Sequence, residues 1–145
     1  MNQLLAITLI NIGLIAAVVI VHYEFLYRAS DAIPRLCARH RPRILLGVFA
    51  SLVAHSVEVW MFGLAYWAMH HAPDLGRLQG NFDGSLLDAA YFSFTTFSTL
   101  GFGDIEPIGA LRYTAAMEAL TGLVLITWSA SFLFMEMQRY WDDDR

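Results

Sequence analysis

The chain has 145 residues, of which 57% are hydrophobic, and a formal net charge of −4. Its mean hydropathy of +0.50 lies above that of ordinary soluble domains, so a membrane protein is the first class to test. All nine basic side chains are arginines without a basic stripe, which argues against a nucleic-acid partner. The single cysteine excludes an internal disulfide and a cysteine-based zinc cage within one chain.

The first apolar run covers residues 4–21 and contains no charged side chain. Two interpretations compete for it, a cleaved signal peptide and a membrane-spanning helix. A signal peptide needs a basic n-region and a shorter apolar core, whereas here no Lys or Arg precedes Arg28. The run is also followed by Tyr23, Phe25 and Tyr27, which suit a membrane interface. We therefore predict a first transmembrane helix.

Three polar residues of this first helix have different expected surroundings. Asn11 lies within the apolar run and is expected to hydrogen-bond a neighbouring helix. His22 and Glu24 follow the run at the inner interface, where such side chains are usually solvated. The sequence therefore predicts one helix contact and two solvated side chains here.

The segment that follows carries five of the nine arginines, so the positive-inside rule makes it cytoplasmic. These are Arg28, Arg35, Arg39, Arg41 and Arg43. Their irregular spacing differs from that of a voltage sensor and favours contacts with lipid head groups. Residues 1–43 are thus expected to form an N-terminal transmembrane helix and a basic cytoplasmic loop. The predicted location is the cell (inner) membrane, with multiple passes, the N-terminus outside and the C-terminus in the cytoplasm.

A second apolar run, residues 44–69, is long enough to span and contains two ionisable residues. His55 and Glu58 are three residues apart and share one helix face. Glu118 lies at a depth from which it could pair with Glu58. Ionisable groups at membrane depth are functional candidates. Three interpretations stay open: a structural hydrogen-bonded cluster, proton-sensitive control of gating, and a metal site, the last including an intramembrane metal-dependent enzyme. We expect no enzyme.

Residues 86–98 are apolar and aromatic but too few to span, because a helix of this length measures about 20 Å. Ser85 is placed to accept a hydrogen bond from the backbone N–H of Asp88, which predicts a pore helix over residues 85–98. A short helix followed by irregular backbone at membrane depth needs surrounding protein or a watery cavity. This pattern predicts a re-entrant pore loop.

The sequence STLGFGD, residues 98–104, follows this helix. Gly101 and Gly103 can take positive φ without a steric penalty, so the carbonyls between them can face one axis. A row of carbonyls can replace the water shell of a potassium ion. Thr99 would add its hydroxyl as the innermost ring of oxygens, while Leu100 and Phe102 would point away from the axis.

The longer stretch SFTTFSTLGFGDIEP resembles the pore segment of the potassium channel family. The filter of that family reads threonine, apolar residue, glycine, aromatic residue, glycine, aspartate. The resemblance covers about 50 residues, since a short helix precedes the motif and a full span follows it. It implies that carbonyls of Thr99, Leu100, Gly101 and Phe102 bind K⁺. Gly103 would close the strand and Asp104 would lie at the outer mouth. No cofactor is implied besides K⁺ as the permeant ion.

The motif also departs from the commonest family form. Phe102 lacks the hydroxyl of a tyrosine, and Phe92 stands where the family often has tryptophan, so both halves of one bond are missing. Tyr91 is then the expected tether, with its hydroxyl reaching Asp104. Thr95 occupies the position where some members carry a glutamate. We expect a filter held more by packing than by hydrogen bonds.

The third span is predicted over residues 113–135. Gly122 lies where inner helices of this family often bend, and the alternative is close helix packing through a small residue. Phe132 or Phe134 would form a hydrophobic constriction at the cytoplasmic entrance, or else face lipid or other helices. Residues 137–145 form a short cytoplasmic tail, so no regulatory cytoplasmic domain is expected.

The predicted fold is an all-α integral membrane protein with three transmembrane helices, a re-entrant pore helix and a filter loop in a fourfold assembly. Its pore domain covers residues 44–136, with the pore helix at 85–98 and the filter at 99–104. One strand of carbonyls cannot enclose an ion, so we expect a homotetramer in membrane lipid. The predicted function is a potassium-selective channel without a small-molecule substrate. The alternatives are a nonselective cation channel and a nonconducting pore-like membrane subunit or sensor.

Overall fold

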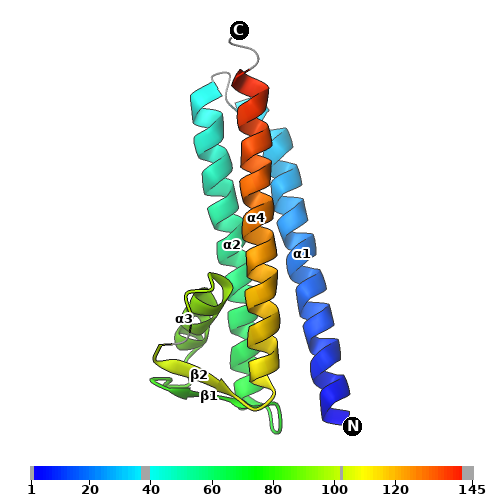
Figure 1. Ribbon diagram of the computed structural model, residues 1–145, viewed down its shortest axis with the longest axis vertical. Coiled ribbons are helices and arrows are strands. Elements are labelled where there is room, and N and C mark those ends of the chain that lie inside the picture. The colour runs from blue at the N-terminus through cyan, green and yellow to red at the C-terminus, as the bar shows by residue number, and fades with distance from the viewer. Residues whose placement is uncertain (1, 37–39, 102, 142–145) are drawn as a thin grey trace.

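Three long helices run side by side through the computed structural model, which describes residues 2–36, 40–101 and 103–141 (Figure 1). They are α1 (Asn2–Leu36), α2 (His40–His71) and α4 (Leu111–Trp141). Each contains a stretch that is long and apolar enough to cross a membrane, at Leu4–Leu36, Pro42–His71 and Leu111–Gln138. The three predicted spans are therefore confirmed.

Helix α1 is longer than the sequence predicted, because the basic segment after the first span is itself helical as far as Leu36. Two ion pairs with i,i+4 spacing support this extension, Glu24 with Arg28 at 2.7 Å and Asp31 with Arg35 at 2.6 Å. The basic loop expected between the first two spans is instead helical up to Leu36 and again from His40. Arg39, one of the five arginines, lies outside the described residues.

The short helix α3 (Leu86–Phe97) and two strands, β1 (Arg77–Gly80) and β2 (Ile105–Ile108), lie beside one end of the long helices (Figure 1). The strands pair antiparallel, with Arg77 opposite Ile108 and Gly80 opposite Ile105. The all-α prediction missed this sheet. Each strand has only four residues and its partner is more than 20 residues away, so no local turn pattern announces the pairing.

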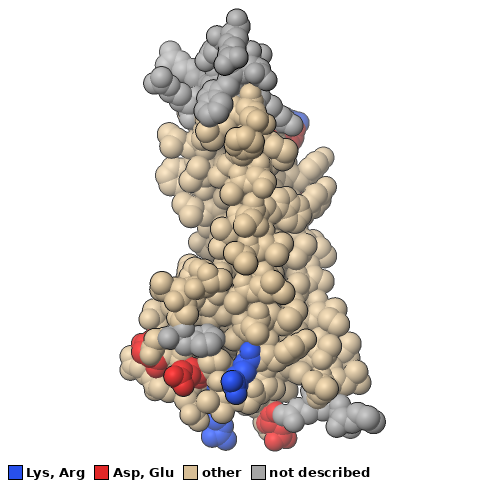
Figure 2. Space-filling model, in the orientation of Figure 1, with Lys and Arg blue, Asp and Glu red and all other residues tan. Residues whose placement is uncertain are grey.

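The core lies where α3 packs against α2 and α4. Tyr66 and Phe92 meet edge to face with their ring centroids 4.9 Å apart, and both are buried. Many other large apolar side chains on the three long helices are exposed. Figure 2 shows that charged side chains gather near the ends of the molecule, while the middle of the face drawn has none. Exposed apolar surface around the middle suits contact with lipid or with neighbouring chains.

The N-terminus, the sheet and α3 lie at one end of the bundle (Figure 1). The C-terminal end of α1, the N-terminal end of α2 and the C-terminal end of α4 lie at the other. The segment that follows α3 is thus at the same end as the N-terminus.

Candidate functional site

Helix α3 begins at a closed cap of three side chains. Ser85 Oγ accepts a hydrogen bond from the Asp88 backbone N–H at 3.1 Å, and Asp88 Oδ2 accepts one from the Asp83 backbone N–H at 3.0 Å. Asp83 Oδ1 in turn accepts from the Ser85 backbone N–H at 2.7 Å. Hydrogen bonds from Ser85 hold the pKa of the Asp83 carboxyl below its ordinary value. The predicted Ser85 cap is confirmed, and it fixes where α3 starts.

At its other end, α3 passes into the filter segment, the name used below for residues 99–104. The Thr99 backbone N–H donates to the carbonyl of Thr96 at 3.0 Å, and the Gly101 N–H donates to the carbonyl of Thr95 at 3.2 Å. Thr99 has φ 58° and Gly101 has φ 96°. Left-handed backbone suits glycine but costs a β-branched residue about 1–3 kcal/mol. The filter segment therefore begins with backbone strain at Thr99.

The filter segment is uncovered in the single chain. The Leu100 side chain is 80% exposed, and Thr99 and Gly101 are also exposed. Phe102, which the sequence places between the two glycines, lies outside the described residues. A groove of about 740 Å³ borders Thr99 and Gly101 and is lined by residues of α3, β2 and α4. This face of one chain has room for further protein.

Asp104, at the end of the filter segment, is held by groups from two other places in the chain. The Tyr91 hydroxyl donates to Asp104 Oδ1 at 3.2 Å, and the Asn81 backbone N–H donates to the Asp104 carbonyl at 2.8 Å. The charge of Asp104 raises the pKa of Tyr91 above its ordinary value. A Cβ on Gly80 would lie 2.0 Å from the Asp104 carbonyl oxygen, so only glycine fits there. The sheet and α3 together fix Asp104.

Gly122 lets α4 approach the C-terminal end of α3 closely. A Cβ at this position would lie 2.3 Å from the carbonyl oxygen of Phe97. Helix α4 runs without a break from Leu111 to Trp141, so close packing accounts for the glycine, and a hinge there stays a prediction. Further along α4, Phe132 is buried and Phe134 is exposed. The two phenylalanines therefore lie in different surroundings.

Glu118 of α4 lies in a buried group with Tyr66 of α2 and Ser93 of α3, called the Glu118 group below. The Tyr66 hydroxyl donates to Glu118 Oε2. The Ser93 hydroxyl lies in reach of both Glu118 Oε1 and the Val59 carbonyl oxygen. All three side chains of the group are buried. The group joins the three helices that surround the start of the filter segment, and the hydrogen bonds described for it do not involve Glu58.

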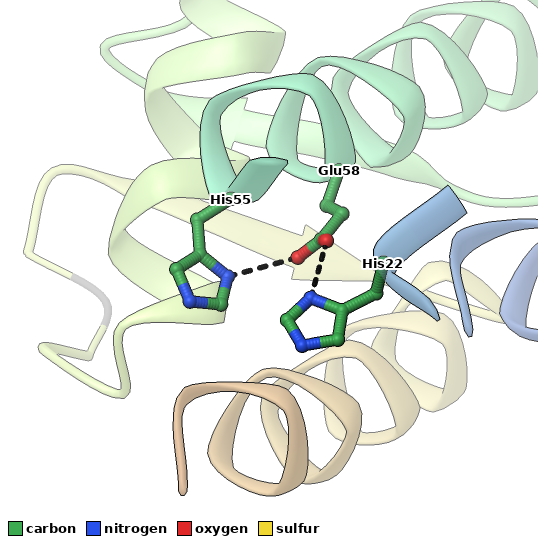
Figure 3. Close-up of side chains that lie close together, drawn as sticks. All are labelled: His22, His55 and Glu58. Carbon is green, nitrogen blue, oxygen red and sulfur yellow. Dashed lines mark hydrogen bonds and ion pairs between the residues drawn. The ribbon is translucent and has the colours of Figure 1, made fainter. Parts of the chain in front are cut away.

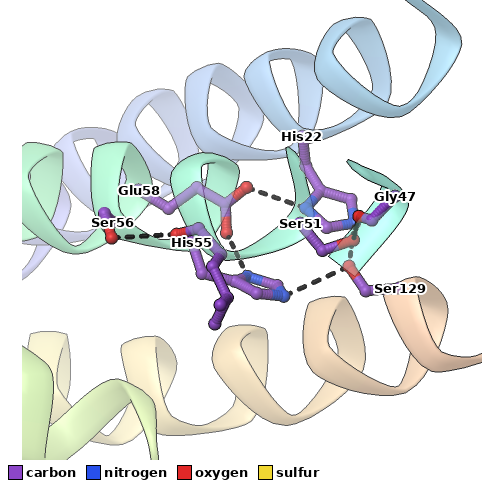
Figure 4. A network of polar contacts seen from close by, with 8 residues as sticks. His22, Gly47, Ser51, His55, Ser56, Glu58 and Ser129 are labelled. Carbon is purple, nitrogen blue, oxygen red and sulfur yellow. Dashed lines mark hydrogen bonds and ion pairs between the residues drawn. The ribbon is translucent and has the colours of Figure 1, made fainter. Parts of the chain in front are cut away.

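A second buried group links α1, α2 and α4 and consists of His22, His55, Glu58 and Ser129; it is called the histidine group below. His22 Nδ1 lies 2.7 Å from Glu58 Oε1, and His55 Nδ1 lies 2.9 Å from Glu58 Oε2. Figure 3 shows the two imidazoles next to each other, each directed at a different oxygen of this carboxylate. On the far side of the rings, Ser129 Oγ lies 3.5 Å from His22 Nε2 and 3.1 Å from His55 Nε2 (Figure 4).

Helix α1 makes a second polar contact with α4 near its other end. Asn11 Nδ2 donates to Thr114 Oγ1 at 3.2 Å and to the Ile7 carbonyl at 2.8 Å. The prediction that Asn11 bonds a neighbouring helix is confirmed. Its Oδ1 has no hydrogen-bond partner among the described residues.

The sequence-predicted polar cluster of His55, Glu58 and Glu118 is divided between the two groups. The expectation of a solvated His22 is wrong, because this side chain is fully buried. A signal was available: His22 follows Asn11 by eleven residues and Val18 by four, which places all three on one helix face. Tyr66, Ser93 and Ser129 were also missed. Their residue types are common on surfaces, and only the packing of separate helices brings them to the carboxylates.

A family model described as an ion channel matches residues 45–139, which include most of α2, all of α3, the filter segment and most of α4. Among similar proteins, the inward rectifier potassium channel Kirbac3.1 of Paramagnetospirillum magnetotacticum is 34% identical over 95 residues. This match covers 63% of the chain, which spans only 30% of the length of that relative. Protein LctB of Geobacillus stearothermophilus is 25% identical over 114 residues, 79% of this chain and 85% of LctB. No solved structure matches the chain.

The family match covers more than half of the chain and contains both spans that flank α3. Helix α1 lies outside the match, so its contacts through Asn11 and His22 are additions to the matched part. Together with three helices suited to crossing a membrane, the match identifies this chain as a multi-pass membrane protein of the ion channel family.

Proposed function

We propose that the chain is a potassium-selective channel whose filter is formed by the backbone carbonyls of residues 99–102 and the Thr99 hydroxyl. The observation that carries this proposal is the exposure of Thr99, Leu100 and Gly101 directly after a capped helix between two spans. Carbonyl oxygens on such a strand can replace the hydration shell of K⁺. Similarity to a potassium channel supports the same ion.

A homotetramer is the proposed assembly, because carbonyls must surround the ion while one chain offers a single strand. Exposure of the filter segment and the adjoining groove of about 740 Å³ support contacts with further copies. In such an assembly α3 acts as a pore helix, and its partly negative C-terminal end favours a cation nearby. Asp104, held by Tyr91, would line the outer mouth.

We also propose that the N-terminus and the filter entrance face outside and that the C-terminus is cytoplasmic, in the cell (inner) membrane. Arg28, Arg35 and Arg43 support this orientation, because arginines collect on the cytoplasmic side and these lie toward the end of α1 and the start of α2. The filter segment lies at the opposite end (Figure 1).

The test is ion flux through liposomes that contain only this protein. A reversal potential close to the potassium equilibrium value is expected with K⁺ on one side and Na⁺ on the other. A value near zero would instead favour the nonselective alternative. Absence of barium-sensitive K⁺ flux would favour a nonconducting subunit.

A matched pair of glycine variants tests the filter segment itself. Gly101→Ala places a Cβ on backbone with φ 96° and should abolish K⁺ flux. Gly13→Ala makes the same change in α1, where a Cβ meets no atom within 4 Å, and should leave flux unchanged. Equal flux from the two variants would contradict the proposed filter.

A further inference from the structure

We propose that His22, His55 and Glu58 bind one divalent transition-metal ion, with Ser129 as the hydrogen-bond acceptor behind both imidazoles. The ligating atoms, one per residue, all lie within 4.8 Å of one another. His22 and Glu58 are fully buried, and His55 is 18% exposed. Two histidines and a carboxylate turned toward one point form a donor set that suits Zn²⁺ and its neighbours.

The spacing of the three ligands is close to that of a tetrahedral site. With metal bonds of about 2.0–2.1 Å, ligand atoms in such a site are about 3.3 Å apart. His22 Nδ1 lies 2.7 Å from Glu58 Oε1 and His55 Nδ1 lies 2.9 Å from Glu58 Oε2, so the two rings contact different oxygens of the carboxylate and both distances must lengthen by about 0.5 Å. The two imidazole nitrogens are at most 4.8 Å apart. Each distance between two ligand atoms would therefore change by at most about 1.5 Å when the site forms.

Ser129 also supports a metal site, because it faces both rings on the side away from Glu58 (Figure 4). If both Nδ1 atoms carry hydrogens for Glu58, two Nε2 lone pairs face a single hydroxyl hydrogen, and one of them goes unpaired. If both Nδ1 atoms bind a metal, each neutral ring carries its hydrogen on Nε2. Ser129 Oγ has two lone pairs and can accept both hydrogens. Ligating histidines usually donate their second N–H in this way.

Aromatic rings flank both imidazoles, and only His55 of the three ligands is partly exposed. The Trp128 ring lies 5.2 Å from the His22 ring, and the Phe97 ring lies 5.6 Å from the His55 ring, measured between centroids. The exposed edge of His55 is the route by which an ion and a fourth ligand, a water molecule or small anion, would enter. As a metal ligand, the Glu58 carboxylate would supply a negative charge that partly neutralises the ion in a low-dielectric environment.

Such a metal would join α1 to α2, with Ser129 adding a contact to α4. The site therefore connects the helix outside the family match to the matched part of the chain. It requires no copy of the chain other than its own. Its occupancy can accordingly be measured whether or not the chain conducts K⁺, so failure of one proposal is distinguishable from failure of the other.

The experiment uses the purified full chain in detergent with Co²⁺ as the probe. Tetrahedral Co²⁺ with nitrogen and oxygen ligands absorbs in the visible range. We expect one bound ion per chain after desalting, displacement by Zn²⁺, and a melting temperature that rises with metal concentration. Wild-type protein that retains no metal and shows no visible bands would overturn the proposal.

Variants locate the ion. His22→Gln and Glu58→Gln each remove one ligand and should weaken Co²⁺ binding at least about 100-fold. Ser129→Ala keeps all three ligands and should weaken Co²⁺ binding about 10–100-fold. The Ser129→Ala variant tests the site even if the variants that lack a ligand fail to fold. The matched control is His71→Gln, which changes an exposed histidine at the end of α2. Equal losses in His71→Gln and His22→Gln would overturn the site.

Discussion

The filter segment and the histidine group are both polar and both lie among apolar helices. They differ in whether their hydrogen-bonding groups have partners within one chain. Thr99, Leu100 and Gly101 are exposed and offer backbone groups, and Thr99 is in a strained conformation. The histidine group is buried apart from the partly exposed His55, and its side chains bond one another within a single chain. The hydrogen bonds of the histidine group are therefore made within one chain, whereas Thr99, Leu100 and Gly101 are left open to the contacts with further copies proposed above.

The largest stability loss should come from breaking the histidine group. Glu58→Ala removes the buried acceptor of both imidazoles and should lower the free energy of unfolding by about 3–5 kcal/mol. Thermal melts in detergent measure this loss. The control, Glu24→Ala, removes a half-exposed carboxylate paired with Arg28 and should cost at most about 1 kcal/mol. Similar losses in both variants would show that the histidine group is no more important than a surface ion pair.

A smaller loss is expected where α4 touches the end of α3. Gly122→Ala would put a Cβ 2.3 Å from the Phe97 carbonyl oxygen, and overpacking of this kind costs about 1–3 kcal/mol. Because α3 must shift away, the filter segment should move and K⁺ flux should fall as well. Melting temperature and liposome flux on the same preparation test both effects. Unchanged stability and flux in the Gly122→Ala variant would mean that α4 and α3 are not in close contact.

Relief of strain in the filter segment should have the opposite sign. Thr99→Gly removes the side chain from backbone with φ 58° and should stabilise the isolated chain by about 1 kcal/mol. The same change deletes the hydroxyl proposed to bind K⁺, so flux should fall. Thr127→Gly is the control, since it removes a threonine from ordinary helix in α4 and should destabilise the chain. A destabilised Thr99→Gly variant would show that the strain is not present in the protein.

The sequence predicted the elements that rest on local pattern. The three spans follow from apolar length, and the start of α3 follows from Ser85 and Asp88, which cap it within four residues. The β1–β2 pairing and the burial of His22 were missed for one reason. Each depends on a partner distant in the sequence, Ile108 for Arg77 and Glu58 for His22. Long-range pairing has no local signature in a single sequence.

The smallest effect is expected at the edge of the filter segment, where Tyr91 donates to Asp104. Tyr91→Phe removes one exposed hydrogen bond, so stability should change little, while K⁺ current should decline faster during sustained conduction. Because the folded-state pKa of Tyr91 is raised, the contact contributes stability below the ordinary tyrosine pKa and loses it as pH rises through the raised value. An alkaline titration of tyrosinate absorbance, compared between wild type and Tyr91→Phe, detects this group. Tyr113→Phe removes another half-exposed tyrosine hydroxyl and should leave the current unchanged. If both variants decline at the wild-type rate, Asp104 is held by the backbone bond from Asn81 and not by Tyr91.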